Sequence, residues 1–227
     1  MARKKETLLI FGAHSDDFVI GAGGTVAKCN EEGKKVISVV FSYGEKSHPW
    51  LKKRETVEMR LRETRNAEKA LGSGKSIFLG LNEGNFEKEF KRKKLAEKIK
   101  RIVTRNKPDK ILLHSKDDPH PDHRALNKII KQLLTEIRYK GEVYVYDIWG
   151  PNIKKGERPK LVVDISKTFK TKIKALRCFE SQRFNAILPL IGSVFFKAIA
   201  NGFKSNTRFA ELFYRIQIQP KKRLKTK

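Results

Sequence analysis

The 227-residue sequence predicts a single α/β domain, because short β-like runs alternate with amphipathic helical stretches along the chain. Residues 36–41 are β-branched and apolar, which is typical of a central strand in a parallel sheet. The sequence contains no internal repeat, low-complexity linker or composition break. We therefore expect a Rossmann-like, mostly parallel sheet with helices on both faces.

Apolar runs, helical periodicity and stop signals predict the strands and helices along the chain. Helix 55–71 has apolar residues at near-helical spacing and ends at Gly72, and Pro108 closes the segment after helix 95–103. Apolar runs predict six strands, at 7–11, 36–41, 76–79, 110–113, 143–146 and 161–164. Periodicity predicts five clear helices, at 24–32, 55–71, 95–103, 125–137 and 168–181. One domain over 1–219 is then followed by a basic, disordered tail at 220–227.

The composition limits the class of protein. With only Cys29 and Cys178, a disulfide scaffold and a four-cysteine zinc site are excluded, and free thiols in a reducing compartment are expected. The first apolar stretch is too short for a signal peptide. The longest one, 186–196, is shorter than the roughly 20 residues that span a bilayer, and Pro189 interrupts it. We expect a soluble cytoplasmic protein, with peripheral membrane contact left open.

The net charge is +26, from 51 Lys and Arg against 25 Asp and Glu. This charge raises the hypothesis of a nucleic-acid partner. However, the basic residues are spread over helical segments, and the chain has no zinc-finger spacing, RRM-type aromatic motif or basic zipper. We interpret the charge as a general surface property that can attract anionic substrates or lipid head groups, and nucleic acid is not the expected partner.

The glycines at 21, 23 and 24 resemble part of a dinucleotide-binding loop. The pattern G-x-G-x-x-G would need glycine at position 26, which is Val26, and the segment begins ten residues past the strand. We exclude a dinucleotide site. These glycines are expected to permit close packing at the start of helix 24–32.

Four of the five histidines lie at or just after the ends of two predicted strands. His14 follows strand 7–11, and His114, His120 and His123 follow strand 110–113. Both loops open on the same edge of the sheet, where open α/β sheets bind their ligands. His48 lies elsewhere and is expected in an ordinary loop, and His114 is expected to be a packed residue rather than a ligand.

Imidazoles and carboxylates are zinc-type ligands, and a catalytic zinc keeps one position for water. His14 and Asp17 are spaced to reach one ion from a turn, and His123 can supply the third ligand. Asp16 must point differently, so it is a candidate general base, while His120 is a candidate proton donor or oxyanion stabiliser.

Asp122 or Asp118 is expected to hold the His120 imidazole in one tautomer. The structural alternative is that these residues only cap helices or form a polar loop.

The two motifs together resemble the PIG-L/LmbE family of zinc-dependent N-deacetylases, which act on N-acetylglucosamine-type substrates. Residues 13–18 read Ala-His-Ser-Asp-Asp-Phe, near the family's Ala/Pro-His-Pro-Asp-Asp-Glu, and 118–123 match Asp-x-His-Pro-Asp-His throughout. The resemblance covers about residues 7–216. Further matching positions are Arg60, Glu63, Ala67, Leu71, Gly72, 163–166, Lys172, 175–176, 181–182 and 210–213.

The resemblance implies one Zn²⁺ per chain held by His14, Asp17 and His123, with Asp16 as base and His120 as acid or oxyanion stabiliser. Arg60 and Glu83 fall where the family places substrate or structural contacts. Ser15 and Phe18 depart from the family's proline and acidic residue, which removes no ligand but puts the substrate preference in doubt.

The expected activity is removal of the N-acetyl group from an N-acetylglucosaminyl compound: a free sugar, a chitin oligomer, a glycoside or a lipid-linked sugar. Two alternatives stay open: a non-catalytic basic protein that binds nucleic acid or a membrane surface through its positive charge and has a vestigial metal site, and an amidase acting on a non-sugar acetamide. The apolar segment 184–203 is expected to be a buried helix, with a pocket lip or a membrane contact as the alternative.

Overall fold

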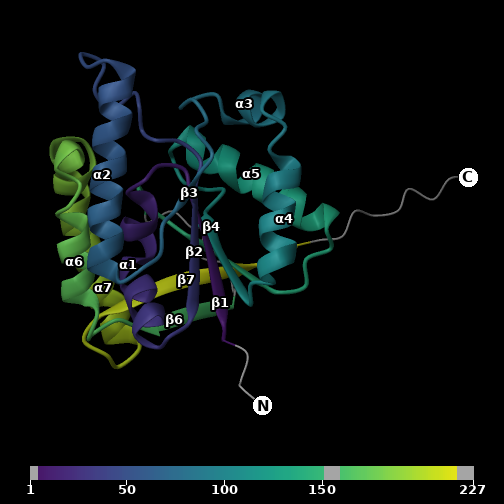
Figure 1. The fold of residues 1–227 in the computed structure, drawn as a ribbon. Coiled ribbons are helices and arrows are strands. Elements are labelled where there is room, and N and C mark those ends of the chain that lie inside the picture. The colour runs from purple at the N-terminus through teal and green to yellow at the C-terminus, as the bar shows by residue number, and fades with distance from the viewer. Residues whose placement is uncertain (1–4, 151–158, 219–227) are drawn as a thin grey trace, which may run out of the picture.

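The computed structural model describes residues 5–150 and 159–218 (Figure 1). The predicted tail at 220–227 lies outside the described residues. Within them, the chain forms a seven-stranded sheet in the order β3-β2-β1-β4-β5-β7-β6. The strands are β1 (Thr7–Gly12), β2 (Lys35–Val40), β3 (Ile77–Phe78), β4 (Lys110–His114), β5 (Glu142–Tyr146), β6 (Lys160–Asp164) and β7 (Ala210–Ile216).

The predicted fold class is confirmed, because neighbouring strands from β3 through β5 are all parallel. β7 runs antiparallel to both β5 and β6. The sequence analysis did not identify β7 as a strand. It completes the sheet by fitting between β5 and β6, which otherwise have no pairing with one another in the strand order.

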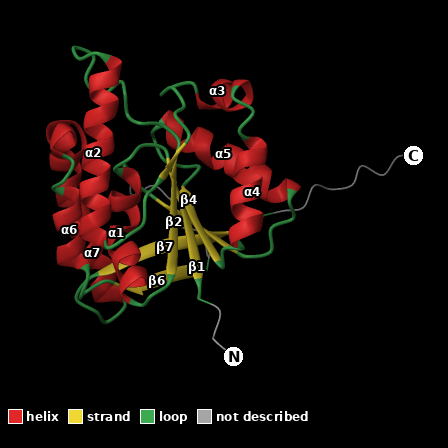
Figure 2. Ribbon diagram, viewed as in Figure 1, coloured by secondary structure: helices red, strands yellow, loops and turns green. Residues whose placement is uncertain are grey.

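The helices form a layer on each face of the sheet. They are α1 (Asp17–Glu31), α2 (Lys53–Leu71), α3 (Phe86–Arg92), α4 (Ala96–Asn106), α5 (Pro121–Glu136), α6 (Phe169–Leu176) and α7 (Leu188–Lys204). Figure 2 shows α1, α2, α6 and α7 on one side of the strands and α3, α4 and α5 on the other. The short, highly charged α3 was not predicted.

Two apolar cores result from the alternation of side chains along each strand. In β1, Leu8 and Ile10 join the core beneath α1, α2, α6 and α7, while Leu9 and Phe11 join the core beneath α3, α4 and α5. This period of two, with both faces apolar, explains why β1 reads as a continuous hydrophobic run.

Helix α1 starts at Asp17, seven residues before the predicted start, so the glycines lie inside the helix. The backbone breaks from helical geometry at Ala22, where φ is −146° and ψ is 17°. A Cβ on Gly21 would lie 2.3 Å from the Tyr146 ring, and one on Gly24 would lie 2.7 Å from the Ile165 side chain. The glycines therefore do permit close packing, although in the helix interior rather than at its start.

Two other helix boundaries differ from the prediction. Helix α5 starts at Pro121 instead of residue 125, with His120 as its N-cap residue. Helix α6 ends at Leu176, and a 3₁₀ turn (Glu180–Gln182) and a π turn (Arg183–Ile187) lead directly into α7. The proline that interrupts the apolar run in sequence, Pro189, lies in the first turn of α7, where its missing N–H costs no helical bond.

The 25-residue helical segment Glu180–Lys204 is long and apolar enough to cross a membrane by length and composition, with a mean hydropathy of 1.6 over its best window. Only 33% of that window is buried in the protein. The expectation of a mostly buried helix is therefore wrong for much of its surface.

Candidate active site

The site lies where β1 and β4 run side by side at the carboxyl edge of the sheet. From β1 the strand order proceeds to β2 on one side and to β4 on the other, so their connections leave in opposite directions. Such a point of reversal leaves a crevice outside the strand ends. The loop after β1 carries His14, and the loop after β4 leads to His120 and into α5.

The structure brings the three expected metal ligands together. One donor atom each from His14, Asp17 and His123 can be chosen so that all lie within 4.8 Å of one another. The backbone N–H of His14 donates to Asp17 Oδ2 at 2.7 Å, which closes the turn between β1 and α1. His123 Nε2 lies 3.4 Å from Asp17 Oδ1. The ligands therefore come from a strand–helix turn and from the first turn of α5.

His123 provides the test of whether these residues fit a metal ion. Its side chain is fully buried, and neither ring nitrogen makes a well-aligned hydrogen bond within the described chain. Nδ1 lies 2.9 Å from Asp118 Oδ1, so this carboxylate orients the ring, while Nε2 faces Asp17 and makes no hydrogen bond within the described chain. Metal-bound histidines characteristically have such a carboxylate behind them. The donor set of two imidazoles and one carboxylate fits a zinc-type ion.

The electrostatics agree with that fit. Burial disfavours a charged His123, but the Asp17 and Asp118 carboxylates raise the pKa of its imidazole to about 9. Burial also raises the pKa of the Asp17 carboxyl. The nearby His123 and His114 outweigh this effect and hold the pKa of Asp17 well below its usual value. The cluster thus concentrates negative charge that a bound cation would neutralise in place of a proton.

His114 is packed beneath the cluster. Its fully buried ring stacks on His123 with centroids 3.8 Å apart, and its Nε2 accepts the backbone N–H of Ala13 at 3.1 Å. Burial, followed by the charge on His123, lowers the pKa of His114 to about 4. Donor atoms of His114, Asp118 and His123 also approach within 4.8 Å. We favour the set that contains His14 and Asp17, because these two residues line the pocket, whereas His114 and Asp118 do not.

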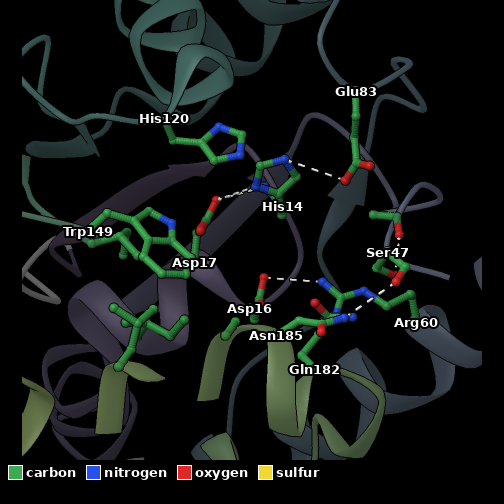
Figure 3. Close-up of a pocket in the computed structure, with 15 residues that line it drawn as sticks. His14, Asp16, Asp17, Ser47, Arg60, Glu83, His120, Trp149, Gln182 and Asn185 are labelled. Carbon is green, nitrogen blue, oxygen red and sulfur yellow. Dashed lines mark hydrogen bonds and ion pairs between the residues drawn. The ribbon is translucent and has the colours of Figure 1, made fainter. Parts of the chain in front are cut away.

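Asp16, the candidate base, precedes α1 and lines the pocket. Its Oδ1 accepts a hydrogen bond from Arg60 Nη2 at 3.2 Å, as Figure 3 shows. Arg60 is 1% exposed, and its Nε donates to the Tyr43 carbonyl at 3.3 Å. Arg60 therefore holds the Asp16 carboxylate at the pocket wall, which supports a positioning role.

His120 faces the pocket from the start of α5, with its ring 4.9 Å from the His14 ring (Figure 3). Its Nδ1 accepts the backbone N–H of Asp122 at 3.2 Å. A nitrogen that accepts carries no proton in the neutral ring, so Nε2 carries it. Burial and then the nearby His14 lower the pKa of His120 to about 4. The local structure thus presents an N–H donor.

Asp122 does not play the part expected of its carboxylate. Its backbone N–H, not its side chain, fixes the His120 tautomer. The carboxylate accepts the Gly84 N–H at 2.9 and 3.0 Å and lies 3.4 Å from His14 Nε2. Glu83 Oε1 lies 3.5 Å from the same nitrogen, while its Oε2 accepts the Lys46 N–H at 2.9 Å. The Asp122 and Glu83 carboxylates therefore both surround His14.

The pocket is small, with a cavity volume of about 130 Å³, below the roughly 300–1,000 Å³ typical of sites that bury a drug-sized ligand. Its far wall comes from Trp149 and Gln182, which were not predicted as site residues, and from Asn185, Ala186 and Leu190 of the segment 184–203, for which a pocket lip was the alternative expectation. The amides of Gln182 and Asn185 lie in the 3₁₀ and π turns before α7. No spacing rule marks such turns, although polar amides beside a long apolar run were a usable signal. His48 is outside this pocket, beside Trp50.

The architecture is that of an open α/β sheet with a metal-type site at its switch point. The model of the PIG-L family, described as GlcNAc-PI de-N-acetylase, matches residues 9–134, and the chain belongs to this family. A curated relative, the probable N-acetyl-α-D-glucosaminyl L-malate deacetylase 2 of Bacillus cereus, is 26% identical over 79% of this chain and 84% of its own. The 4-oxalmesaconate hydratase of Pseudomonas putida is 27% identical over 80% of this chain and 76% of its own.

Solved structures share the fold. The N,N′-diacetylchitobiose deacetylase from Pyrococcus horikoshii aligns with a TM-score of 0.77 at 23% identity, over 95% of this chain and 85% of that one. The 4-carboxy-2-hydroxymuconate hydratase from Pseudomonas putida aligns with a TM-score of 0.75 at 21% identity, over 96% and 99%.

Proposed function

We propose that this protein is a zinc-dependent deacetylase that removes the acetyl group from an N-acetylglucosaminyl-type substrate, with one Zn²⁺ per chain. The observation that carries the proposal is the convergence of His14, Asp17 and His123 within 4.8 Å, beside a pocket lined by Asp16 and His120. Membership of the PIG-L family and the deacetylases among its relatives support the reaction class.

In this proposal the two imidazoles and the Asp17 carboxylate hold the metal ion. When bound there, zinc supplies Lewis acidity and makes a water molecule nucleophilic near neutral pH. Asp118 orients the His123 ring through its contact with Nδ1. Asp122 and Glu83 flank His14 in the same way, so we assign them to ligand positioning.

The reaction adds a water oxygen to the acetyl carbon and breaks the C–N bond. Asp16 accepts the proton that the attacking water loses, with its carboxylate oriented by Arg60. His120 donates its Nε2–H to the oxygen of the acetyl group, where negative charge develops. Asp16 then returns the proton to the departing nitrogen, so the products are a free amine and acetate.

We propose a cytoplasmic location from the state of the two cysteine thiols. Cys29 and Cys178 are both free, which supports work in a reducing compartment such as the cytoplasm.

Acetate release from N-acetylglucosamine, N,N′-diacetylchitobiose and N-acetylglucosaminides tests the proposal. Asp16→Asn is expected to lower kcat by about 10²–10⁴-fold and His120→Gln by about 10²–10³-fold. His48→Gln is the matched control, because this histidine lies outside the pocket, and it is expected to keep full activity.

Two outcomes would overturn the proposal. Full activity in Asp16→Asn would remove the assigned base. Hydration of 4-oxalmesaconate, with no acetate released from any amide, would assign the chain to the chemistry named for its hydratase relative. Release of acetate only from non-sugar acetamides would keep the mechanism and change the substrate class.

A further inference from the structure

One face of the Glu180–Lys204 segment is apolar and largely exposed within the described chain. Most neighbouring members are three, four or seven residues apart, and Phe195 and Phe196 are adjacent, so all of them fall on one side of a helix. They account for six of the ten large hydrophobic side chains exposed in the described residues. We call them the apolar face: Phe184 (77% exposed), Leu188 (48%), Phe195 (39%), Phe196 (72%), Ile199 (52%) and Phe203 (87%).

The helix cannot rotate to bury this face. Its opposite side is packed through Leu190, Val194 and Ala198, which are buried in the core that includes β7 residues. Near its end, Gly202 is fixed by close approach, since a Cβ there would lie 2.7 Å from the carbonyl oxygens of Thr207 and Arg208. The apolar face is therefore a fixed feature of the folded surface, of the kind that marks an interaction site.

The charge in the sequence around the apolar face is mostly positive. Between Lys167 and Arg208 the sequence contains nine Lys and Arg residues, of which Lys172 is buried in an ion pair with Glu211, and a single acid, Glu180. The guanidinium of Arg183 lies 5.8 Å from the centre of the Phe184 ring. Helix α6, which carries the exposed Lys170 and Lys174, contacts α7 through Phe169 and Phe195, whose ring centres are 5.0 Å apart.

We propose that the apolar face docks onto the surface of an anionic phospholipid bilayer. An amphipathic helix with large apolar side chains and flanking Lys and Arg gains from both lipid burial and attraction to anionic head groups. A second copy of this chain fits less well as the partner. If two apolar faces met, the Lys and Arg residues around one face would lie against those around the other and repel them. An anionic lipid surface instead supplies negative charge that attracts these Lys and Arg residues.

Docking in this way places the pocket beside the lipid surface. Gln182, Asn185 and Leu190 line the pocket and belong to the same helical segment as the apolar face. Trp149, 40% exposed, lines the same pocket. The docking surface is independent of the chemistry proposed for the site, so either can fail without the other.

Flotation with phosphatidylglycerol-rich vesicles, compared with pure phosphatidylcholine vesicles, tests the inference. The wild type is expected to float with the anionic vesicles only, and raised salt is expected to weaken its binding. The variant Phe184→Ser/Phe196→Ser/Phe203→Ser is expected to lose at least about tenfold in affinity, because full burial of even one phenylalanine is worth that factor. Trp50→Ser, at a 73% exposed tryptophan outside the face, is the control and is expected to bind normally.

The single variant Phe203→Ser, at the most exposed position, guards against a folding defect in the triple variant. It is expected to melt like the wild type and to bind anionic vesicles more weakly. Equal vesicle binding by wild type and triple variant would refute the proposal, as would wild-type protein that stays free of anionic vesicles. A wild-type dimer that the triple variant converts to monomer, with no vesicle binding, would assign the face to a second copy instead.

Discussion

Glu211 on β7 holds the two halves of α1 together, and we predict that Glu211→Gln destabilises the protein strongly. The break at Ala22 leaves the backbone N–H groups of Gly24 and Thr25 available, and both donate to Glu211, at 3.0 and 2.7 Å. The Thr25 hydroxyl adds a bond of 2.6 Å, and Lys172 Nζ one of 2.7 Å. The strand carboxylate thus acts as a cap for the second half of the helix.

The magnitude follows from burial. Glu211 is 5% exposed and Lys172 is 4% exposed, so neither charge has ready access to water. Glutamine removes the negative charge and turns one acceptor into a donor facing other donors. Breaking a buried ion pair from one side costs about 3–5 kcal/mol. For a chain of this size, each kcal/mol lowers Tm by about 2–4 °C, so a fall of roughly 6–20 °C is expected.

Urea unfolding of Glu211→Gln, Lys172→Met and the double variant measures the pair. Because the double variant leaves no buried charge, its cost is expected to be well below the sum of the single costs. Glu142→Gln is the control, since its pair with Arg215 is largely exposed and is worth at most about 1 kcal/mol. The reasoning is refuted if Glu211→Gln costs less than about 1 kcal/mol, or if the two single costs simply add.

Two further predictions concern packing and thiol chemistry. Gly24→Ala is expected to lower the free energy of unfolding by about 1–3 kcal/mol, because the added Cβ would lie 2.7 Å from the Ile165 side chain. Gly74→Ala is the control, because a Cβ at Gly74 would meet open space. Equal melting temperatures of the two variants would contradict this prediction. Burial raises the pKa of the Cys29 thiol to about 11, so about 0.1% is thiolate at pH 8, against about a quarter of a free thiol. Iodoacetamide labelling followed by mass spectrometry is expected to be correspondingly slow, and labelling at the rate of free cysteine would show an accessible, ionised group.

Most of the sheet could be predicted because its strands are buried on both faces. In β1 and β4 the residues 8–11 and 111–113 are all apolar and buried, so the runs stand out from the surrounding charge. β7 could not be found this way, since it mixes Glu211 and Arg215 with apolar residues and gains its place through Lys172, far away in sequence. The start of α1 was missed because Gly21, Gly23 and Gly24 disfavour a helix locally, while packing against Tyr146 and Ile165 requires them.

In the site, too, some features could be predicted from the sequence and others could not. The rule that parallel strand ends share one sheet edge predicted that His14, Asp17 and His123 could meet, and the resemblance to the family singled out this set. The contact of Asp122 with His14 instead of His120 could not be predicted, because it depends on how the first turn of α5 meets the Gly84 N–H. The apolar wall of the pocket depends on irregular turns before α7, which no periodicity reveals.

Metal content of the untagged protein, measured by elemental analysis beside His123→Ala and the control His48→Ala, tests the central claim most directly. We predict about one zinc per chain in the wild type and in His48→Ala, and loss of that zinc in His123→Ala, because His123 Nε2 is buried beside Asp17 and makes no hydrogen bond within the described chain. Absence of metal from all three proteins, even after zinc is added back, would contradict the assignment of His14, Asp17 and His123 as a metal site.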